Sequence, residues 1–193
     1  MKSITVFCGS NEGFNEIYKT QSNQLGQIMA KKGIGMVYGG GCIGLMGAVA
    51  DGILKKGGKV IGVIPGFLKR KEIVHNQLTE LITVNSMHER KIKMHELSEG
   101  AIALPGGYGT MDELFEMLTW GQLGLHKKPV GIYNINNFYD SLYRHIQLMV
   151  DHGFLSDLNR KMLLISNDVE DLLSQMANYK PPEIDKRITK ESV

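Results

Sequence analysis

The chain has 193 residues, a length typical of one domain with a sizeable hydrophobic core. Apolar residues make up 42% and charged residues 22%, which are ordinary values for a globular protein, and the formal net charge is +2. This weak and interspersed charge argues against nucleic acid or a membrane as the main partner, whereas a phosphorylated small molecule would need only a local positive site.

Short apolar runs alternate with helix-length amphipathic stretches along the whole chain. In chain order, strands are expected at 4–8, 35–38, 59–64, 81–84, 101–104 and 130–133, helices at 14–32, 45–56, 87–97, 110–123 and 138–152, and the segments 163–165 and 169–179 close the pattern. Residues 66–80 read as irregular. Largely apolar strands that alternate with helices predict an α/β fold, a Rossmann-like doubly wound parallel sheet in three α/β/α layers. Residues 1–180 are expected to form a single domain, and residues 181–193 a C-terminal tail.

The chain shows no sign of export or membrane insertion. Its first residues lack the apolar stretch of a secretory signal, and no apolar run approaches the roughly 18 residues of a membrane span. Cys8 and Cys42 have no zinc-site spacing and are expected to be reduced thiols in a cytoplasmic protein. Both are predicted at or just beyond strand ends, so a disulfide between them is conceivable but not expected.

Three glycine-containing loops follow predicted strands, at 9–10, 39–44 and 106–110. In a parallel sheet these loops fall at one edge, where ligands bind outside the carboxyl ends of the strands. From this placement we expect the following residues to contact a substrate: Gly9, Ser10, Gly40, Gly41 and Gly44.

The loop at 39–44 matches G-x-G-x-x-G between a strand and a helix. A dinucleotide site would also need an acidic residue about 20 positions on, where this chain has Val63-Ile64-Pro65, and it would normally follow the first strand. NAD binding is therefore disfavoured. The remaining interpretation of this motif is a glycine turn that lets a ligand approach the N-terminus of the following helix.

The loop Pro105-Gly106-Gly107-Tyr108-Gly109-Thr110 leads from a strand into a helix. Glycines allow a ligand close to the backbone, and the helix start offers unpaired N–H groups, so the segment suits a phosphate. The G-K-[ST] ending of a triphosphate loop is absent. A competing interpretation is that Thr110 and Glu113, spaced T-x-x-E, form a capping box that only stabilises the helix.

A charged cluster, His88-Glu89-Arg90-Lys91, opens the helix that precedes this strand. Such clusters usually lie in solvent. However, Arg90 could reach the same sheet edge and donate hydrogen bonds to a phosphate, a ribose or a base.

Together, PGGYGTMDE at 105–113 and MHERK at 87–91 resemble the LOG (Lonely Guy) family of phosphoribohydrolases. The resemblance covers about residues 3–180 and includes CGS at 8–10, YGGG at 38–41, GLMG at 44–47 and TWGQLGLHKKP at 119–129. It implies hydrolysis of the N-glycosidic bond of adenosine-type 5′-monophosphates, N6-modified cytokinin nucleotides included, to free base and ribose 5-phosphate. It implies Arg90 and Glu113 as the catalytic pair, and the following substrate contacts: Glu72, Lys91, Gly106, Gly107, Tyr108, Gly109 and Thr110. A homodimer is also implied.

The implied chemistry is physically coherent. Cleavage of a ribosyl C–N bond develops oxocarbenium character on the sugar, which a carboxylate such as Glu113 would stabilise, or the carboxylate would orient the attacking water. Arg90 is too basic for a good general acid, so it is expected to orient the substrate and stabilise charge on the departing base. No metal or cofactor is expected. The older description of such proteins as possible lysine decarboxylases is discounted, because no pyridoxal-phosphate lysine motif is recognisable. The main alternative is a non-catalytic Rossmann-like protein that binds a nucleotide or the molybdenum cofactor.

Overall fold

The computed structural model describes residues 1–69 and 74–183. The elements in chain order are β1 (Ser3–Phe7), α1 (Glu16–Lys31), β2 (Gly35–Tyr38), α2 (Gly44–Leu54), β3 (Val60–Pro65), β4 (Glu80–Val84), α3 (Met87–Leu97), β5 (Ala101–Ala103), α4 (Tyr108–Gln122), β6 (Val130–Tyr133), the 3-10 helix η1 (Ile135–Asn137), α5 (Asp140–Asp151), α6 (Asp157–Arg160), β7 (Leu163–Ser166) and α7 (Val169–Ala177). Most of the tail expected at 181–193 lies outside the described residues.

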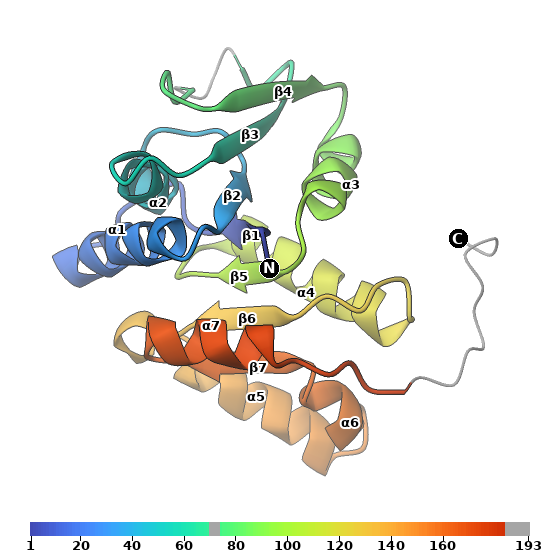
Figure 1. Cartoon of the computed structure of the whole chain (residues 1–193). Helices are drawn as coiled ribbons and strands as arrows, with labels where there is room; N and C mark the ends of the chain where they lie inside the picture. Colours follow the sequence, from blue (N-terminus) through green and yellow to red (C-terminus); the bar gives the residue numbers. More distant parts are fainter. Residues whose placement is uncertain (70–73, 184–193) are drawn as a thin grey trace.

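The seven strands form one sheet in the order β4-β3-β2-β1-β5-β6-β7, and every pair is parallel (Figure 1). The chain winds outward from β1 to β4, then returns to place β5 on the other side of β1. The order therefore reverses between β1 and β5, which makes the carboxyl ends of these two strands the topological switch point. The expected doubly wound α/β fold is confirmed.

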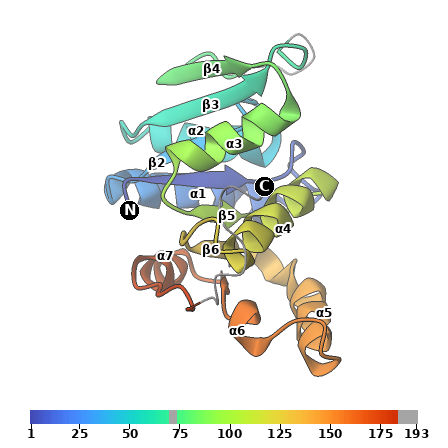
Figure 2. The same cartoon turned by 90° about the vertical axis from the view of Figure 1, so that its right-hand side faces the viewer.

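Helices cover both faces of the sheet (Figures 1 and 2). On β1, Ile4 and Val6 point into a core shared with α1, α2 and α7, while Phe7 points into a second core with α3, α4 and α5. This period-two alternation, with both faces apolar, explains why the strands read as nearly continuous apolar runs. Within the described ranges, no helix combines the length and apolarity needed to cross a bilayer.

Three features differ from the expected elements. The strand β4 begins at Glu80, inside the stretch expected to be irregular, and α4 begins at Tyr108, two residues before the expected Thr110. The short helices η1 and α6 were not expected, because three or four residues cannot display a helical period.

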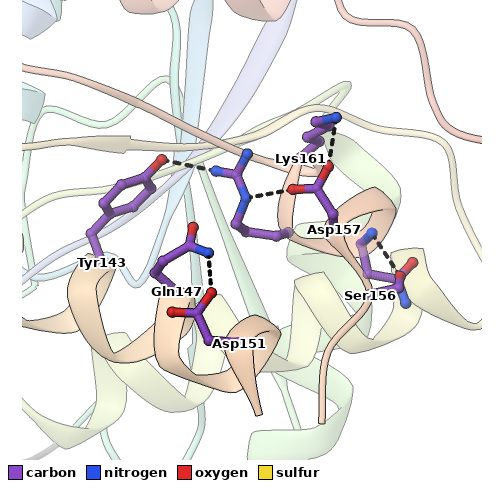
Figure 3. Close-up of polar contacts among 8 residues, drawn as sticks. Tyr143, Gln147, Asp151, Ser156, Asp157 and Lys161 are labelled. Atoms are coloured by element: carbon purple, nitrogen blue, oxygen red, sulfur yellow. Dashed lines mark hydrogen bonds and ion pairs between the residues drawn. The ribbon is translucent and has the colours of Figure 1, made fainter. Parts of the chain in front are cut away.

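A polar contact joins α6 to α5, and further contacts lie within each helix (Figure 3). Arg160 of α6 donates from Nη1 to the hydroxyl of Tyr143 on α5 at 2.8 Å and from Nε to Asp157 at 3.1 Å. Ser156 caps α6 by accepting from the N–H of Asn159. The bond between Arg160 and Tyr143 therefore joins α6 to α5, while the contacts of Asp157 and Ser156 stabilise α6 itself.

Candidate active site

A cavity of about 500 Å³ opens at the switch point between β1 and β5. This volume lies within the range of small-molecule sites. Its lining comes from β1, from the loops after β1, β2 and β5, from helices α1 to α4, and from the segment before α5. The described lining residues are Val6, Cys8, Gly9, Ser10, Asn11, Glu12, Gly13, Tyr18, Gly39, Leu45, Met46, Met87, Arg90, Met94, Pro105, Gly106, Gly107, Tyr108, Gly109, Thr110, Glu113 and Phe138.

Direct backbone contacts join the loops after β1 and β5. The N–H of Gly9 donates to the carbonyl of Pro105 at 3.0 Å, and the N–H of Leu104 donates to the carbonyl of Phe7 at 2.8 Å. The parallel sheet thus continues into its loops, which holds Gly9, Ser10 and the glycine segment after Pro105 at one wall of the cavity.

The N-terminus of α4 is open toward this cavity. Its N-cap is Gly107, which has no side chain to cap the helix, and no acidic residue lies in the first turn. The first N–H groups and the positive end of the helix dipole are therefore available to an anion. Thr110 lies inside the helix and is buried at 3% exposure, so the capping-box interpretation of Thr110 and Glu113 is wrong.

A capping arrangement does exist at α3. There the hydroxyl of Ser86 accepts from the N–H of Glu89 at 3.1 Å, and the carboxylate of Glu89 accepts from the N–H of Asn85 at 2.7 Å. This arrangement fixes the start of the helix that carries Arg90.

Glu113 lines the cavity one turn along α4 from Gly109. Burial raises the pKa of its carboxyl to about 7, against the opposing effect of the positive charges of Arg90 and Lys91. Glu113 can therefore exchange a proton near neutral pH, which is a property expected of a catalytic carboxyl.

Arg90 projects from the first turns of α3 and is only 7% exposed. Its Nη1 approaches the sulfur of Met87 at 3.8 Å, and its buried Nε has no acceptor among the described residues. A Cβ added at Gly39 would lie 1.9 Å from its Nη2, so only glycine at position 39 leaves room for the guanidinium. Arg90 and Glu113 form no ion pair with each other, so both keep binding capacity for a ligand in the cavity they share.

Lys91 lies beside this pair but outside the cavity lining. Its Nζ lies 2.8 Å from the carboxylate of Asp112 and 3.3 Å from that of Glu116, both on α4. The structure thus directs the expected substrate contact Lys91 toward two carboxylates of the neighbouring helix.

The loop after β2 contributes Gly39 to the cavity, while the expected contacts Gly40, Gly41 and Gly44 do not line it. Gly40 accepts from the N–H of His75, and Gly41 forms a β-bridge with Val74. Gly44 has φ +65°, and a Cβ there would lie 2.3 Å from the backbone of Ser10. At Gly44 the absence of a side chain therefore lets the loop after β2 pack against the loop after β1. Glu72 lies outside the described residues.

Two aromatic residues of the cavity wall were not anticipated. Tyr18 and Phe138 line the cavity and form an edge-to-face pair with ring centroids 6.1 Å apart. Phe138 is positioned by the preceding Asn134, whose buried side chain bonds the N–H of Tyr139 and the carboxylate of Asp140. The sequence offers no local signal for this wall, because its two residues are 120 positions apart.

Cys8 also lines the cavity, and burial, together with the nearby Glu113, raises the pKa of its thiol. Cys8 and Cys42 form no disulfide. Over residues 1–69 and 74–183, no group of three or more histidine, cysteine or acidic residues could hold a metal ion.

Comparisons with known proteins place this chain in a family. The sequence model described as "Possible lysine decarboxylase" matches residues 46–176. Cytokinin riboside 5′-monophosphate phosphoribohydrolase LOG7 of Arabidopsis thaliana is 42% identical, over 93% of this chain and 83% of the relative. The enzyme of the same description named LOG, from Oryza sativa subsp. japonica, is 41% identical over 93% of this chain and 74% of the relative.

Solved structures support the fold at lower sequence identity. The X-ray structure of TM1055 superposes with a TM-score of 0.71 at 22% identity, covering 93% of this chain and all of that one. The molybdenum cofactor binding protein from Rippkaea orientalis superposes with a TM-score of 0.69 at 21% identity, covering 92% of this chain and 96% of that one. Because relatives above 40% identity match nearly the whole chain and the family model matches residues 46–176, the protein belongs to the LOG family of phosphoribohydrolases.

Proposed function

We propose that this protein hydrolyses the N-glycosidic bond of adenosine-type 5′-monophosphates, N6-modified cytokinin nucleotides included, and releases the free base and ribose 5-phosphate. The observation that carries the proposal is that an open helix N-terminus, a carboxyl with a raised pKa and a buried arginine face one cavity of about 500 Å³. The names of the relatives supply the bond that is cleaved and the class of nucleotide.

The phosphate is assigned to the N-terminus of α4, at Gly106, Gly107, Tyr108, Gly109 and Thr110. A helix start without an acidic cap favours a dianion through its free N–H groups and dipole. The loop after β1, with Gly9 and Ser10, lies beside this segment at the same wall of the cavity.

The ribose then lies beside Glu113, one helical turn from the phosphate. Water attacks the anomeric carbon as the bond to the base nitrogen breaks, and the carboxylate of Glu113 accepts the proton of this water and stabilises positive charge on the sugar. Arg90 orients the nucleotide and stabilises the electron pair left on the base. The base nitrogen takes a proton from solvent, and Glu113 releases the proton of the attacking water to solvent, so the carboxylate is regenerated. The raised pKa of Glu113 makes its carboxylate a stronger base than an ordinary glutamate.

The base is assigned to the apolar part of the cavity, formed by Leu45, Met46, Met87 and Met94. Methionine side chains are flexible and polarisable, so they can pack against a purine and against an apolar group on its N6. This surface is compatible with both AMP and an N6-prenylated nucleotide.

Two other functions are less well supported. A pyridoxal-phosphate decarboxylase needs a lysine to form a Schiff base, and none of the described residues lining the cavity is a lysine. A molybdenum cofactor binding protein shares the fold, but similarity at 21% identity concerns the fold alone.

An activity assay tests the proposal. Purified protein is incubated with AMP and with N6-isopentenyl AMP, and the released bases are separated by chromatography. Wild type is expected to release free base, and Glu113→Ala to lose at least about two orders of magnitude in rate, as expected when a charge partner of the transition state is removed. Glu170→Gln, on the opposite face of the sheet, is the matched control. Base release that persists undiminished in Glu113→Ala would refute the role of Glu113.

We further propose that the protein is a homodimer. The exposed apolar side chains of Leu148, Phe154 and Leu158 on and beside α5 and α6 support an interface there. Light scattering at micromolar concentration is expected to give twice the monomer mass for wild type and the monomer mass for Phe154→Asp. A monomeric wild type would contradict this proposal.

A further inference from the structure

The segment 74–77, which precedes β4, is bound to the loop after β2. Val74 forms an antiparallel β-bridge with Gly41, and the N–H of His75 donates to the carbonyl of Gly40 at 3.0 Å. The side chain of His75 is buried, at 7% exposure. A short backbone pairing thus joins this segment to the glycine loop at the carboxyl edge of the sheet.

The imidazole of His75 has a partner at each ring nitrogen. The N–H of Gln77 donates to Nδ1 at 3.2 Å, so the ring proton lies on Nε2, which donates to the carboxylate of Asp51 at 3.0 Å. Asp51 belongs to α2, and its side chain is 62% exposed. Neither His75 nor Asp51 lines the cavity. The buried ring therefore ties segment 74–77 to α2 from outside the ligand space.

The loop after β2 in turn limits where Arg90 can lie. Gly39 of this loop lines the cavity and packs against the guanidinium of Arg90. The buried Nε of Arg90 has no acceptor among the described residues, and its Nη1 bonds only to the sulfur of Met87, a weak acceptor. Because no strong hydrogen bond fixes the guanidinium, its place depends on packing, and therefore on the position of Gly39.

We propose that His75 and Asp51 are positioning residues for the proposed reaction. Their hydrogen bond fixes segment 74–77 on the loop after β2, and this loop holds Gly39 against Arg90. The inference rests on the proposed function for its kinetic readout. It has one specific consequence: an exposed carboxylate outside the cavity should change the rate, because its loss displaces Arg90.

Substitutions at Asp51 test this consequence. Asp51→Ala should lower kcat for AMP about tenfold, because a small displacement of an orienting group is costly. KM should change less than about threefold, since the phosphate is bound at α4. Asp51→Asn should stay within about twofold of wild type, because its amide oxygen still accepts from Nε2. A merely structural carboxylate would affect melting but not kcat at a temperature where every variant is folded.

Two further variants complete the kinetic test. His75→Phe should lose at least as much rate as Asp51→Ala, and the double variant should lose no more than His75→Phe alone, because both changes remove the same bond. Glu170→Ala is the matched control, because it removes an exposed carboxylate that pairs with Lys32 at 2.7 Å between α7 and the end of α1. Circular dichroism melting confirms that each variant folds.

Two measurements need no substrate. The NMR signal of the Nε–H of Arg90, assigned with Arg90→Lys, should shift in Asp51→Ala and not in Asp51→Asn. Amide hydrogen exchange over residues 74–79 should become at least about tenfold faster in Asp51→Ala. If wild type releases no base, the proposed function fails and these two measurements alone decide the inference. Unchanged exchange over residues 74–79, an unshifted Arg90 signal, or kcat within twofold of an active wild type in Asp51→Ala would each overturn it.

Discussion

Replacing Glu113 with glutamine should make the protein more stable above neutral pH and inactive. Burial raises the pKa of this carboxyl from 4.5 to about 7, so the folded protein holds its proton over a range in which the unfolded chain has lost it. A raised acid pKa therefore costs stability as pH increases from about 4.5 to about 7. The shift of the pKa from 4.5 to about 7 lowers the free energy of unfolding by at most about 3 kcal/mol, because each pKa unit corresponds to about 1.4 kcal/mol.

Urea unfolding of wild type and Glu113→Gln at pH 5 and pH 8 measures this cost. From pH 5 to pH 8, we expect the free energy of unfolding of Glu113→Gln to increase relative to that of wild type by up to about 3 kcal/mol. Glu170→Gln should show no such increase. In wild type, kcat/KM should rise about 30-fold between pH 5.5 and 8.5 as the carboxylate forms, whereas an ordinary glutamate would already be ionised. The nucleotide phosphate also titrates near pH 6, so the unfolding data are the decisive readout. Equal pH dependence of stability in wild type and Glu113→Gln would refute the raised pKa.

Three further changes test neighbouring parts of the structure. Thr110→Ala should weaken AMP binding about tenfold with little change in melting temperature, because Thr110 does not cap α4; calorimetry that finds lost stability at unchanged affinity would restore the capping interpretation. Gly39→Ala should lower kcat at least about tenfold by displacing Arg90, since the new Cβ would lie 1.9 Å from Nη2; steady-state rates like those of wild type would contradict this packing. Burial, with Lys128 and His126 nearby, lowers the pKa of His95 to about 4, so wild type should lose stability as pH falls from about 6.5 to 4. Urea unfolding at pH 7.5 and 4.5 measures this loss. Between these pH values the free energy of unfolding of His95→Phe should decrease less than that of wild type, by up to about 3 kcal/mol. An identical decrease in both proteins would exclude the effect.

Periodicity and glycine placement were sufficient to predict the doubly wound sheet and the sheet edge that carries the site. The segment from Pro105 to Glu113 lies where a loop after a parallel strand must lie, and Arg90 reaches the same cavity because α3 begins at that edge. These features follow from local pattern and from the geometry of parallel sheets.

Features that depend on contacts between distant segments could not be predicted in this way. The spacing T-x-x-E is the same whether a helix begins at Thr110 or two residues earlier, and only the fold shows that it begins at Tyr108. The pairing of Tyr18 with Phe138 and the direction of Lys91 toward α4 likewise depend on how helices far apart in the sequence pack together.

The switch point has a consequence for biosynthesis. The strand β1 gains its neighbour β2 soon after it leaves the ribosome, but its other neighbour β5 begins at Ala101, almost 100 residues later. At about 5 to 20 residues per second, one edge of the central strand stays unpaired for roughly 5 to 20 s during translation. Unpaired strand edges promote association between chains, so the late arrival of β5 leaves the nascent protein exposed to aggregation during this interval.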